Sequence, residues 1–505
     1  PRPAAGSLLF SQHADGYTDL FALTAGAAEP LRLTFDMAEE RDPTWSPDGR
    51  SLAYAARQAG NWDIYVLRLP GGRVERLTDD PAFQAAPAWS PDGEWLAFEG
   101  YHEGNLDLYL MPAEGGPPTR LTEEPGPDSA PVWAPGGRHL IFTSWRAGEP
   151  DLFALSLDAP ADAAAWNLTQ SAGLFEDAAA LAPDGRTLAY QESGSGLNLV
   201  YVLSLSDYLP VGSPRLIGQG RQPTWSPDGR SLAYVYDDGR RNYLVTSALN
   251  AWGVPPQAYA AEADLNGLAW SALALTRDLP ARLAARAPAE AQPVYVELLD
   301  PPQPEGAPYL LRPVEVSAPS PYLSDRVNGA FNALRLRLQQ EAGWDVLGRL
   351  DGLYLRPGEP APLGEPEESW ARAGRAFDLQ AGLALALEPQ LEVVREDWAG
   401  ETYWRVFSRA AAQDGSQGEP LRRRPWNFQA RYDQDPRYYD QGGRLKETIP
   451  AGYYVDLTAL AADYGWERVP AHPTWRGFFP AINFWRFEKR QDLSWAAAMA
   501  ELYPD

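Results

Sequence analysis

The sequence PTWSPDGRSLAY, at residues 43–54, returns in four more copies along the first half of the chain. The copies are PAWSPDGEWLAF (87–98), PVWAPGGRHLIF (131–142), AALAPDGRTLAY (179–190) and PTWSPDGRSLAY (223–234). Their anchor residues, Trp45, Trp89, Trp133, Leu181 and Trp225, are separated by 44, 44, 48 and 44 residues. Such regular spacing indicates that one supersecondary unit is repeated.

Each copy predicts four short antiparallel strands. An apolar run ends in Trp, a Ser-Pro-Asp-Gly turn follows, and a second run alternates apolar and polar residues. Pro fixes φ and Gly adopts the positive φ that closes a hairpin, so the two runs are expected to pair. A third run, DIYVL (63–67), and a fourth that carries Arg-Leu-Thr (76–78) complete the unit. Four strands in about 44 residues predict a propeller blade.

The ends of the repeat region predict how the ring closes. SLLF (7–10), DLFAL (19–23) and LRLT (31–34) align with the second, third and fourth strands of a blade. The missing first strand is supplied by GLAWS (267–271), where Trp270 lies 45 residues after Trp225. We therefore predict a six-bladed propeller over residues 1–275.

The turn W-S-P-D-G and the strand D-[IL]-[YF] resemble those of the TolB-like propeller family, over about residues 5–275. The resemblance implies a domain that binds other proteins or gates a hydrolase domain. Because the Trp residues and the strand Asp residues recur in every good copy, we expect them to serve packing and turns, not a unique site.

The loops between blades are rich in acidic residues, and these define a predicted acidic rim. Its members are Glu39, Glu40, Asp42, Asp79, Asp80, Glu123 and Glu124. Such a rim suits a cation or a basic partner, whereas the simpler interpretation is a solvated loop surface. No spacing reproduces a calcium-loop motif, so we predict no cofactor.

Composition excludes several functions. The formal charge of -25, without a basic stripe, argues against nucleic acid, and the absence of Cys excludes disulfides and thiolate chemistry. No apolar run reaches about 18 residues, so no membrane span is predicted. The chain starts at Pro1 inside a folded unit, and we expect a leader or anchor to have been removed from an extracellular or cell-envelope protein.

The second half predicts a linker and a smaller α+β domain. Residues 276–320 are rich in Pro and Ala, with one strand-like stretch, VYVELL (294–299), and are expected to form the linker. Residues 321–505 form the predicted domain, with a helix that starts at Ser324 and ends at Gly343.

Two stretches of this domain, EPEESWARAGRAFDL (365–379) and PAINFWRFE (480–488), resemble the metal-binding frames of D-Ala-D-Ala carboxypeptidase and Hedgehog-type zinc peptidases. Ser369 and Asp378 match the first frame, S-x-H-x-x-G-x-A-x-D, but Ala371 stands where the family has His. In the second frame, E-x-W-H-[FY], Asn483 and Arg486 stand at the catalytic Glu and the ligand His.

These replacements argue against catalysis of the family's kind, because a catalytic zinc requires three protein ligands and a base for its water. We therefore predict no catalytic residue and no metal, without excluding an enzyme. Arg486 is expected to pair with Asp378, so that a guanidinium replaces the cation.

Aromatic residues of the second domain are candidates for ligand stacking or for core packing: Trp426, Tyr432, Tyr438, Tyr439 and Trp485. The preferred hypothesis is a secreted or surface-displayed, non-catalytic binding or scaffold protein that recognises protein or cell-envelope material, either peptidoglycan peptide or cell-wall glycan. The alternatives are a hydrolase of peptidoglycan peptides with an atypical metal site, and a self-assembling extracellular structural protein.

Overall fold

The computed structural model describes residues 6–504 apart from 15, 25–26, 28, 36–37, 59, 70, 159, 161, 172, 195, 239–240, 250–256, 262–263, 274, 276–278, 280–282, 284–293, 297–307 and 399. The contacts divide the chain into two compact units, Pro1–Gln292 and Pro293–Asp505. Each unit is described by itself.

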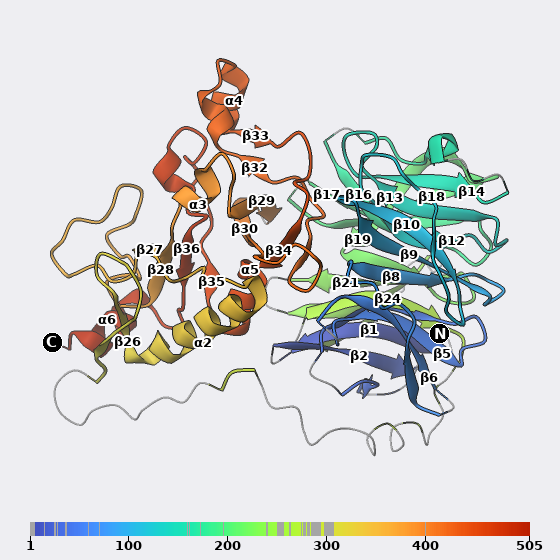
Figure 1. Cartoon of the computed structure of the whole chain (residues 1–505), viewed down its shortest axis with the longest axis horizontal. Coiled ribbons are helices and arrows are strands. Elements are labelled where there is room, and N and C mark those ends of the chain that lie inside the picture. Colours follow the sequence, from blue (N-terminus) through green and yellow to red (C-terminus); the bar gives the residue numbers. More distant parts are fainter. Residues whose placement is uncertain are drawn as a thin grey trace. The chain divides into compact units, whose positions relative to one another are not determined.

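The first unit contains six four-stranded antiparallel sheets, drawn in blue to green in Figure 1. The sheets, from the inner to the outer strand, are β24(Asp264–Ser271)-β1(Ser7–Ala14)-β2(Tyr17–Thr24)-β3(Leu31–Arg32), β4(Glu40–Trp45)-β5(Ser51–Ala56)-β6(Asp63–Arg68)-β7(Arg73–Arg76), β8(Gln84–Trp89)-β9(Trp95–His102)-β10(Asn105–Pro112)-β11(Thr119–Arg120), β12(Asp128–Trp133)-β13(His139–Ser144)-β14(Asp151–Ser156)-β15(Trp166–Asn167), β16(Phe175–Leu181)-β17(Thr187–Ser193)-β18(Leu199–Ser206)-β19(Leu209–Gln219) and β20(Arg221–Trp225)-β21(Ser231–Asp237)-β22(Asn242–Ala248)-β23(Gln257–Ala261). The predicted six-bladed propeller is confirmed.

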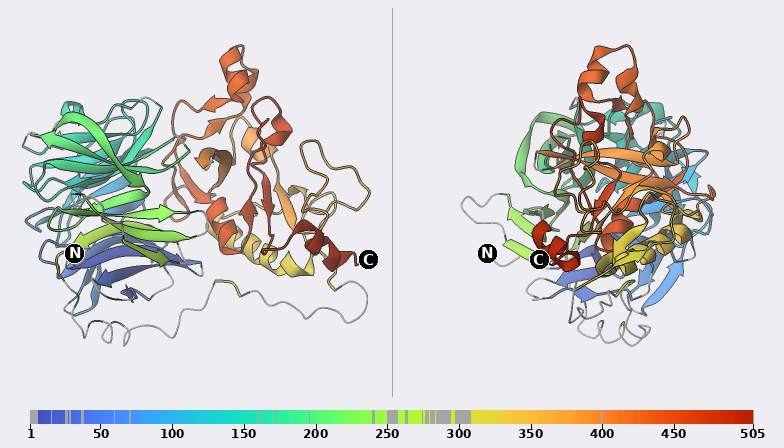
Figure 2. Two further views of the ribbon diagram at one scale, coloured as in Figure 1. Left: turned by 180° about the vertical axis from the view of Figure 1, so that it is seen from behind. Right: turned by 90° about the vertical axis from the view of Figure 1, so that its left-hand side faces the viewer.

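One blade is built from both ends of the propeller sequence. Strand β24 pairs antiparallel with β1, and Trp270 lies opposite Leu8. Figure 2 shows the green strands of this region beside the blue ones. The ring therefore closes by hydrogen bonds between segments that are far apart in the chain.

The Ser-Pro-Asp-Gly turn between β4 and β5 is held by its own side chains. Ser46 Oγ donates to Asp48 Oδ1 at 2.7 Å and accepts from the Ser51 N–H at 2.9 Å. The same Asp48 oxygen accepts from the Arg50 N–H at 3.0 Å, and Gly49 has φ 64°. This chemistry explains why the turn recurs in the sequence.

The recurring Asp and the Arg-Leu-Thr run belong to one network in the three blades that carry both, where Arg32 pairs with Asp19, Arg76 with Asp63 and Arg120 with Asp107. In the blade of β8–β11, Arg120 Nη2 donates to Asp107 Oδ2 at 2.7 Å, and the Thr122 hydroxyl accepts the Leu108 N–H at 3.0 Å. Asp107 is fully buried. The network ties the outer strand to its neighbour, so these repeated residues stabilise the blade.

Indole groups link successive blades. Trp133 Nε1 donates to the Ala88 carbonyl and Trp225 Nε1 to the Ala180 carbonyl, each at 3.0 Å. In both cases the acceptor lies on the first strand of the preceding blade. Trp133 and Trp225 thus join neighbouring sheets, whereas no hydrogen-bond partner for Nε1 of Trp45 or Trp89 is found among the described residues.

The second unit, drawn in yellow to red in Figure 1, is α+β as predicted. Its sheets are β27(Leu350–Gly352)-β28(Ala376–Leu379)-β36(Arg486–Glu488)-β35(Glu467–Arg468), β29(Leu391–Trp398)-β30(Glu401–Arg409)-β34(Tyr453–Asp456)-β31(Glu419–Pro420), β25(Leu311–Pro313)-β26(Tyr322–Ser324) and β32(Trp426–Asn427)-β33(Arg444–Leu445). Its α-helices in the described residues are α2(Asp325–Ala342), α3(Gly382–Leu385), α4(Pro436–Gln441), α5(Leu457–Asp463) and α6(Trp495–Leu502). Short 3-10 turns occupy Asp162–Ala164 in the first unit and Gln429–Tyr432 and Phe479–Ala481 in the second.

Helix α2 has the predicted bounds. The Ser324 side chain caps its first turn by accepting from the Arg326 N–H, and Gly343 ends it at φ 74°. Its apolar face, which includes Phe331 and Leu338, lies in the main core of the unit.

The predicted linker, residues 276–320, needs a correction at its end. Strand β25 lies within it and pairs with β26, and the Tyr309 N–H donates to the Glu501 carbonyl at 3.1 Å. The described residues 308–320 therefore pack with the second unit. Most of residues 276–307, including the end of the strand-like stretch 294–299, lies outside the described residues.

Candidate functional site

A buried ion-pair network joins β28 to β36. Asp378 and Arg486 are direct cross-strand partners. The guanidinium Nε lies 2.8 Å from Asp378 Oδ1 and Nη2 lies 2.6 Å from Oδ2, a bidentate pair. Nη2 also contacts Glu365 Oε1, and the Arg486 side chain is only 4% exposed. The ion pair expected from the sequence is present.

Glu365 is the member of this network that the sequence reasoning missed. Its Oε2 accepts from the hydroxyl of Ser369 at 2.9 Å, and the Ser369 hydroxyl accepts from the Ala371 N–H at 3.3 Å. The available signal was the acidic run 365–368 ahead of the metal-like frame. No spacing rule distinguishes Glu365 from the other acids of that run.

Electrostatics keep a permanent cation in this network. Burial raises the pKa of Asp378, and the Arg486 guanidinium opposes the rise. Burial acts to lower the pKa of Arg486, but the carboxylates of Asp378 and Glu365 outweigh it and raise that pKa. Arg486 therefore stays charged between two carboxylates.

The remaining frame positions do not join this network through their side chains. Ala371 packs in a small apolar cluster with Trp370 and Ala498. Asn483 adopts φ 60° ahead of β36, and its side-chain N–H donates to the Pro470 carbonyl at 3.1 Å. With a methyl group at one frame position and a guanidinium on the carboxylate of another, these residues do not fit a zinc ion.

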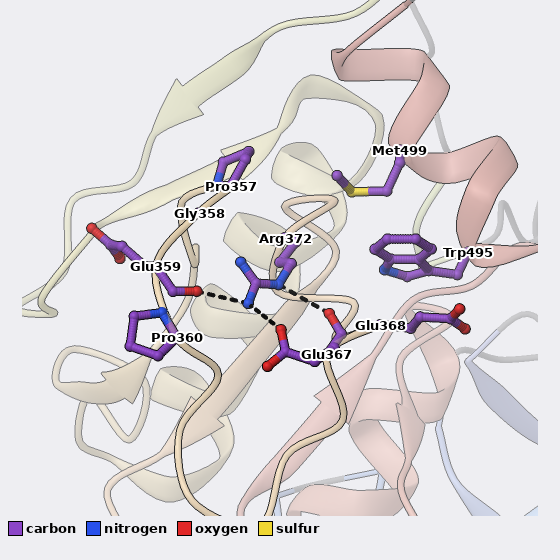
Figure 3. Close-up of a pocket in the computed structure, with 9 residues that line it drawn as sticks. All are labelled: Pro357, Gly358, Glu359, Pro360, Glu367, Glu368, Arg372, Trp495 and Met499. Atoms are coloured by element: carbon purple, nitrogen blue, oxygen red, sulfur yellow. Dashed lines mark hydrogen bonds and ion pairs between the residues drawn. The ribbon is translucent and has the colours of Figure 1, made fainter.

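An open pocket of about 610 Å³ lies beside the frame. One wall consists of Trp495 and Met499 from α6, and the facing wall consists of residues 357–360 (Figure 3). Three acidic residues, Glu359, Glu367 and Glu368, also belong to the lining. Apolar surface and acidic groups therefore meet in one concave site.

The single guanidinium of the pocket, that of Arg372, is engaged in the protein's own structure. It donates to the backbone carbonyls of Arg356, Glu359 and Glu367 at 2.9, 2.8 and 3.0 Å. It also donates to Glu367 Oε2 at 3.1 Å, as Figure 3 shows. Arg372 is 6% exposed, so its guanidinium stabilises the backbone around the pocket and does not face solvent.

The candidate aromatic residues have different surroundings. Trp426 is 8% exposed and packs against Trp404 and Trp475, so the interpretation as a ligand-stacking residue is wrong for Trp426. Its indole belongs to the main core of the unit, which the sequence alone does not reveal.

The other four candidates are more accessible. Tyr432 and Tyr439 are 70% and 55% exposed. Tyr438 is half-buried beneath the Arg444 guanidinium, and Trp485 is half-buried among the rings of the core. The structure therefore leaves Tyr432 and Tyr439 as the surface aromatic residues of this set.

The predicted acidic rim is not a uniform ring of exposed carboxylates. Asp79, Asp80 and Glu123 are exposed, whereas Glu39, Asp42 and Glu124 are half-buried. Glu40 is fully buried at the start of an inner strand, which corrects its assignment to the rim. Among the described residues, no group of three or more His, Cys, Asp or Glu residues is placed to hold a metal ion.

The comparisons with known proteins concern the propeller. Residues 78–273 match the family described as TolB beta propeller domain, so this part of the chain is TolB-like. TolB from Acinetobacter baumannii is 22% identical with a TM-score of 0.48, and the match covers 52% of this chain and 66% of that one. A putative TolB from Agrobacterium tumefaciens is 23% identical with a TM-score of 0.38, covering 44% of this chain and 83% of that one.

A chain of a nidogen/laminin complex is 11% identical with a TM-score of 0.43, and the match covers 53% of this chain and all of that one. No curated protein matches the sequence. Because the family match lies within the first unit, the peptidase resemblance of the second unit stays a prediction. In the part of the chain that the structure describes, no helix is both long and apolar enough to cross a membrane.

Proposed function

We propose that this chain is a non-catalytic binding protein of the bacterial cell envelope, which recognises envelope peptides through its second unit and uses its TolB-like propeller as a scaffold. The family match of residues 78–273 supports the scaffold role and the envelope location. The second unit supports the binding role, because its metal-like frame holds a guanidinium and a concave site lies beside that frame.

The observation that carries the proposal is the bidentate pairing of Arg486 with Asp378. A peptidase of the resembled kind requires that carboxylate for its metal. Here both Asp378 oxygens are engaged by a buried cation that belongs to the protein, and Glu365 adds a second carboxylate to the same cation. The frame therefore stabilises the fold and leaves neighbouring surfaces for recognition.

Co-sedimentation with purified, protein-free peptidoglycan sacculi tests this proposal. We expect the chain to pellet with the sacculi and to release no soluble peptide or glycan fragments, with or without a chelator. Fragments that increase with protein amount and incubation time, and that a chelator suppresses, would establish the metal-dependent hydrolase instead. Failure to pellet would overturn the assignment of peptidoglycan peptides as the bound material.

A second candidate, self-association, is favoured by strand β19. It is the outer strand of its blade, and Leu209, Val211 and Leu216 are 56%, 52% and 51% exposed. Among the described residues, no strand pairs with its outer edge. An exposed apolar edge strand is suited to pairing with another chain.

Light scattering across a concentration series tests self-association. Under this second proposal the apparent mass rises with concentration, and Val211→Lys reduces the rise because a charged side chain blocks edge pairing. A mass that stays at that of one chain over the whole series would contradict it.

A further inference from the structure

We propose that the pocket lined by Trp495, Met499, Glu359, Glu367 and Glu368 binds a primary ammonium group on an aliphatic side chain of a peptide. The inference rests on the proposed binding function and names the ligand chemistry for the second unit. The lining contains three Glu residues and one Arg, so its formal charge is net negative.

The carboxylates differ in how far they are already engaged. Glu367 pairs with Arg372 at 3.1 Å, although its side chain is 83% exposed. For Glu359 and Glu368, both exposed, no side-chain partner is found among the described residues. These two carboxylates are therefore available to an incoming cation, while the Arg372 donors are directed to the protein's own carbonyls.

The apolar wall of the pocket favours an alkyl ammonium group over a metal ion. Trp495 is half-buried, and its Nε1 donates to the Ser369 carbonyl at 3.1 Å, which fixes the ring in place. Met499 lies one helical turn further along α6 and is also half-buried. A hydrated metal ion gains nothing from an indole and a thioether, whereas a methylene chain packs on them and an ammonium group is attracted to an aromatic face.

The pocket size agrees with this ligand. A volume of about 610 Å³ exceeds that of a single ion and admits a side chain together with its flanking backbone. Because one side of the pocket is open, the ligand can be a residue within a longer chain. Such ammonium groups occur on lysine in proteins and on the diamino residue of peptidoglycan stem peptides.

Ligand-observed saturation-transfer NMR on the full chain provides the direct test. The probes are the capped tripeptide acetyl-Gly-Lys-Gly-amide and the same peptide acetylated on the lysine Nε, which has no charge. We expect saturation of the lysine methylene protons in the first probe and at least tenfold weaker binding of the second, since only the first carries the cation.

The Glu359→Gln/Glu368→Gln variant isolates the pocket. We expect its affinity for the lysine probe to fall roughly tenfold, because two partly screened ion pairs are removed. The matched control, Asp79→Asn/Glu123→Gln, changes the net charge equally at exposed positions of the propeller and should stay within twofold of the parent chain. An equal loss in both variants, or equal binding of the two probes, would overturn the inference, since either result indicates general attraction to an acidic protein.

The sacculus assay separates the two proposals. If the parent chain binds the lysine probe but not sacculi, the pocket inference stands and the peptidoglycan function fails. If the pocket variant still pellets with sacculi like the parent chain, the pocket is not the site of envelope recognition and the link between the two proposals is refuted. We expect the pocket variant to lose both activities.

Discussion

Replacing the buried guanidinium tests the central feature of the second unit. In Arg486→Gln, the carboxylates of Asp378 and Glu365 lose the cation that contacts both. The Arg486 side chain is only 4% exposed, so water does not readily replace it. Removing one partner of a buried ion pair costs about 3–5 kcal/mol, which for a unit of roughly 200 residues corresponds to a fall in Tm of roughly 6–20 °C.

Differential scanning calorimetry at pH 7.5 and at pH 5 is the assay. Burial already raises the pKa of Asp378 above its ordinary value, and loss of the guanidinium that opposes the rise raises it further. In the variant, the folded state therefore takes up protons on acidification, so its deficit relative to the parent chain shrinks between pH 7.5 and pH 5. If Arg486→Gln lost stability only through poorer packing, its deficit would be the same at pH 7.5 and at pH 5.

The control makes the same chemical change at the surface of the same unit. Arg437 pairs with Asp435, but its side chain is 78% exposed. Arg437→Gln should therefore change the stability by less than about 1 kcal/mol. A Tm for Arg486→Gln that lies within 1 °C of the parent chain, or a deficit independent of pH, would refute the reasoning.

Three further predictions follow from buried polar groups. Asp378→Asn should lower the Tm less than the loss of the guanidinium, because Glu365 still balances that charge; an unchanged Tm in calorimetry would contradict a buried pair. Burial raises the pKa of Asp128 to about 7, so the contribution of this group to the free energy of unfolding should fall as the pH rises from about 4 toward 7. In Asp128→Asn, the free energy of unfolding measured with urea should therefore depend less steeply on pH, by up to about 1.4 kcal/mol per pH unit. Thr122→Val should cost about 1–3 kcal/mol in urea unfolding, because the buried Leu108 N–H loses its acceptor, whereas Thr119→Val at an exposed position should cost less than about 0.5 kcal/mol.

The repeat made the propeller predictable to the level of single strands. Each copy carries its own turn chemistry, as the hydrogen bonds between Ser46 and Asp48 show, and a blade needs no distant residue to define it. Repetition also identified the strand Asp residues as structural before the pairing of Asp107 with Arg120 was seen. Local rules suffice where the same local structure recurs.

The second unit was less predictable because its important contacts join distant segments. The bidentate pair between Asp378 and Arg486 followed from a family resemblance, and Glu365 was not anticipated. The pocket joins the loop around residue 358 to a helix that starts at Trp495, and no sequence pattern relates them. Trp426 was ambiguous for the same reason, since burial depends on partners such as Trp475 elsewhere in the chain.

The position of charge in the second unit separates structural groups from candidate binding groups. Asp378 and Glu365 share a cation that the protein supplies, and a ligand would have to displace it at the full cost of burying unpaired charge. Glu359 and Glu368 are exposed and belong, like Trp495, to the lining of the pocket, so an incoming ammonium group would meet no cation that must first leave. Reversible binding of a cation requires carboxylates that are not already paired with a buried cation of the protein. The pocket beside the frame, and not the frame itself, is therefore the place where this unit is expected to exchange ligands.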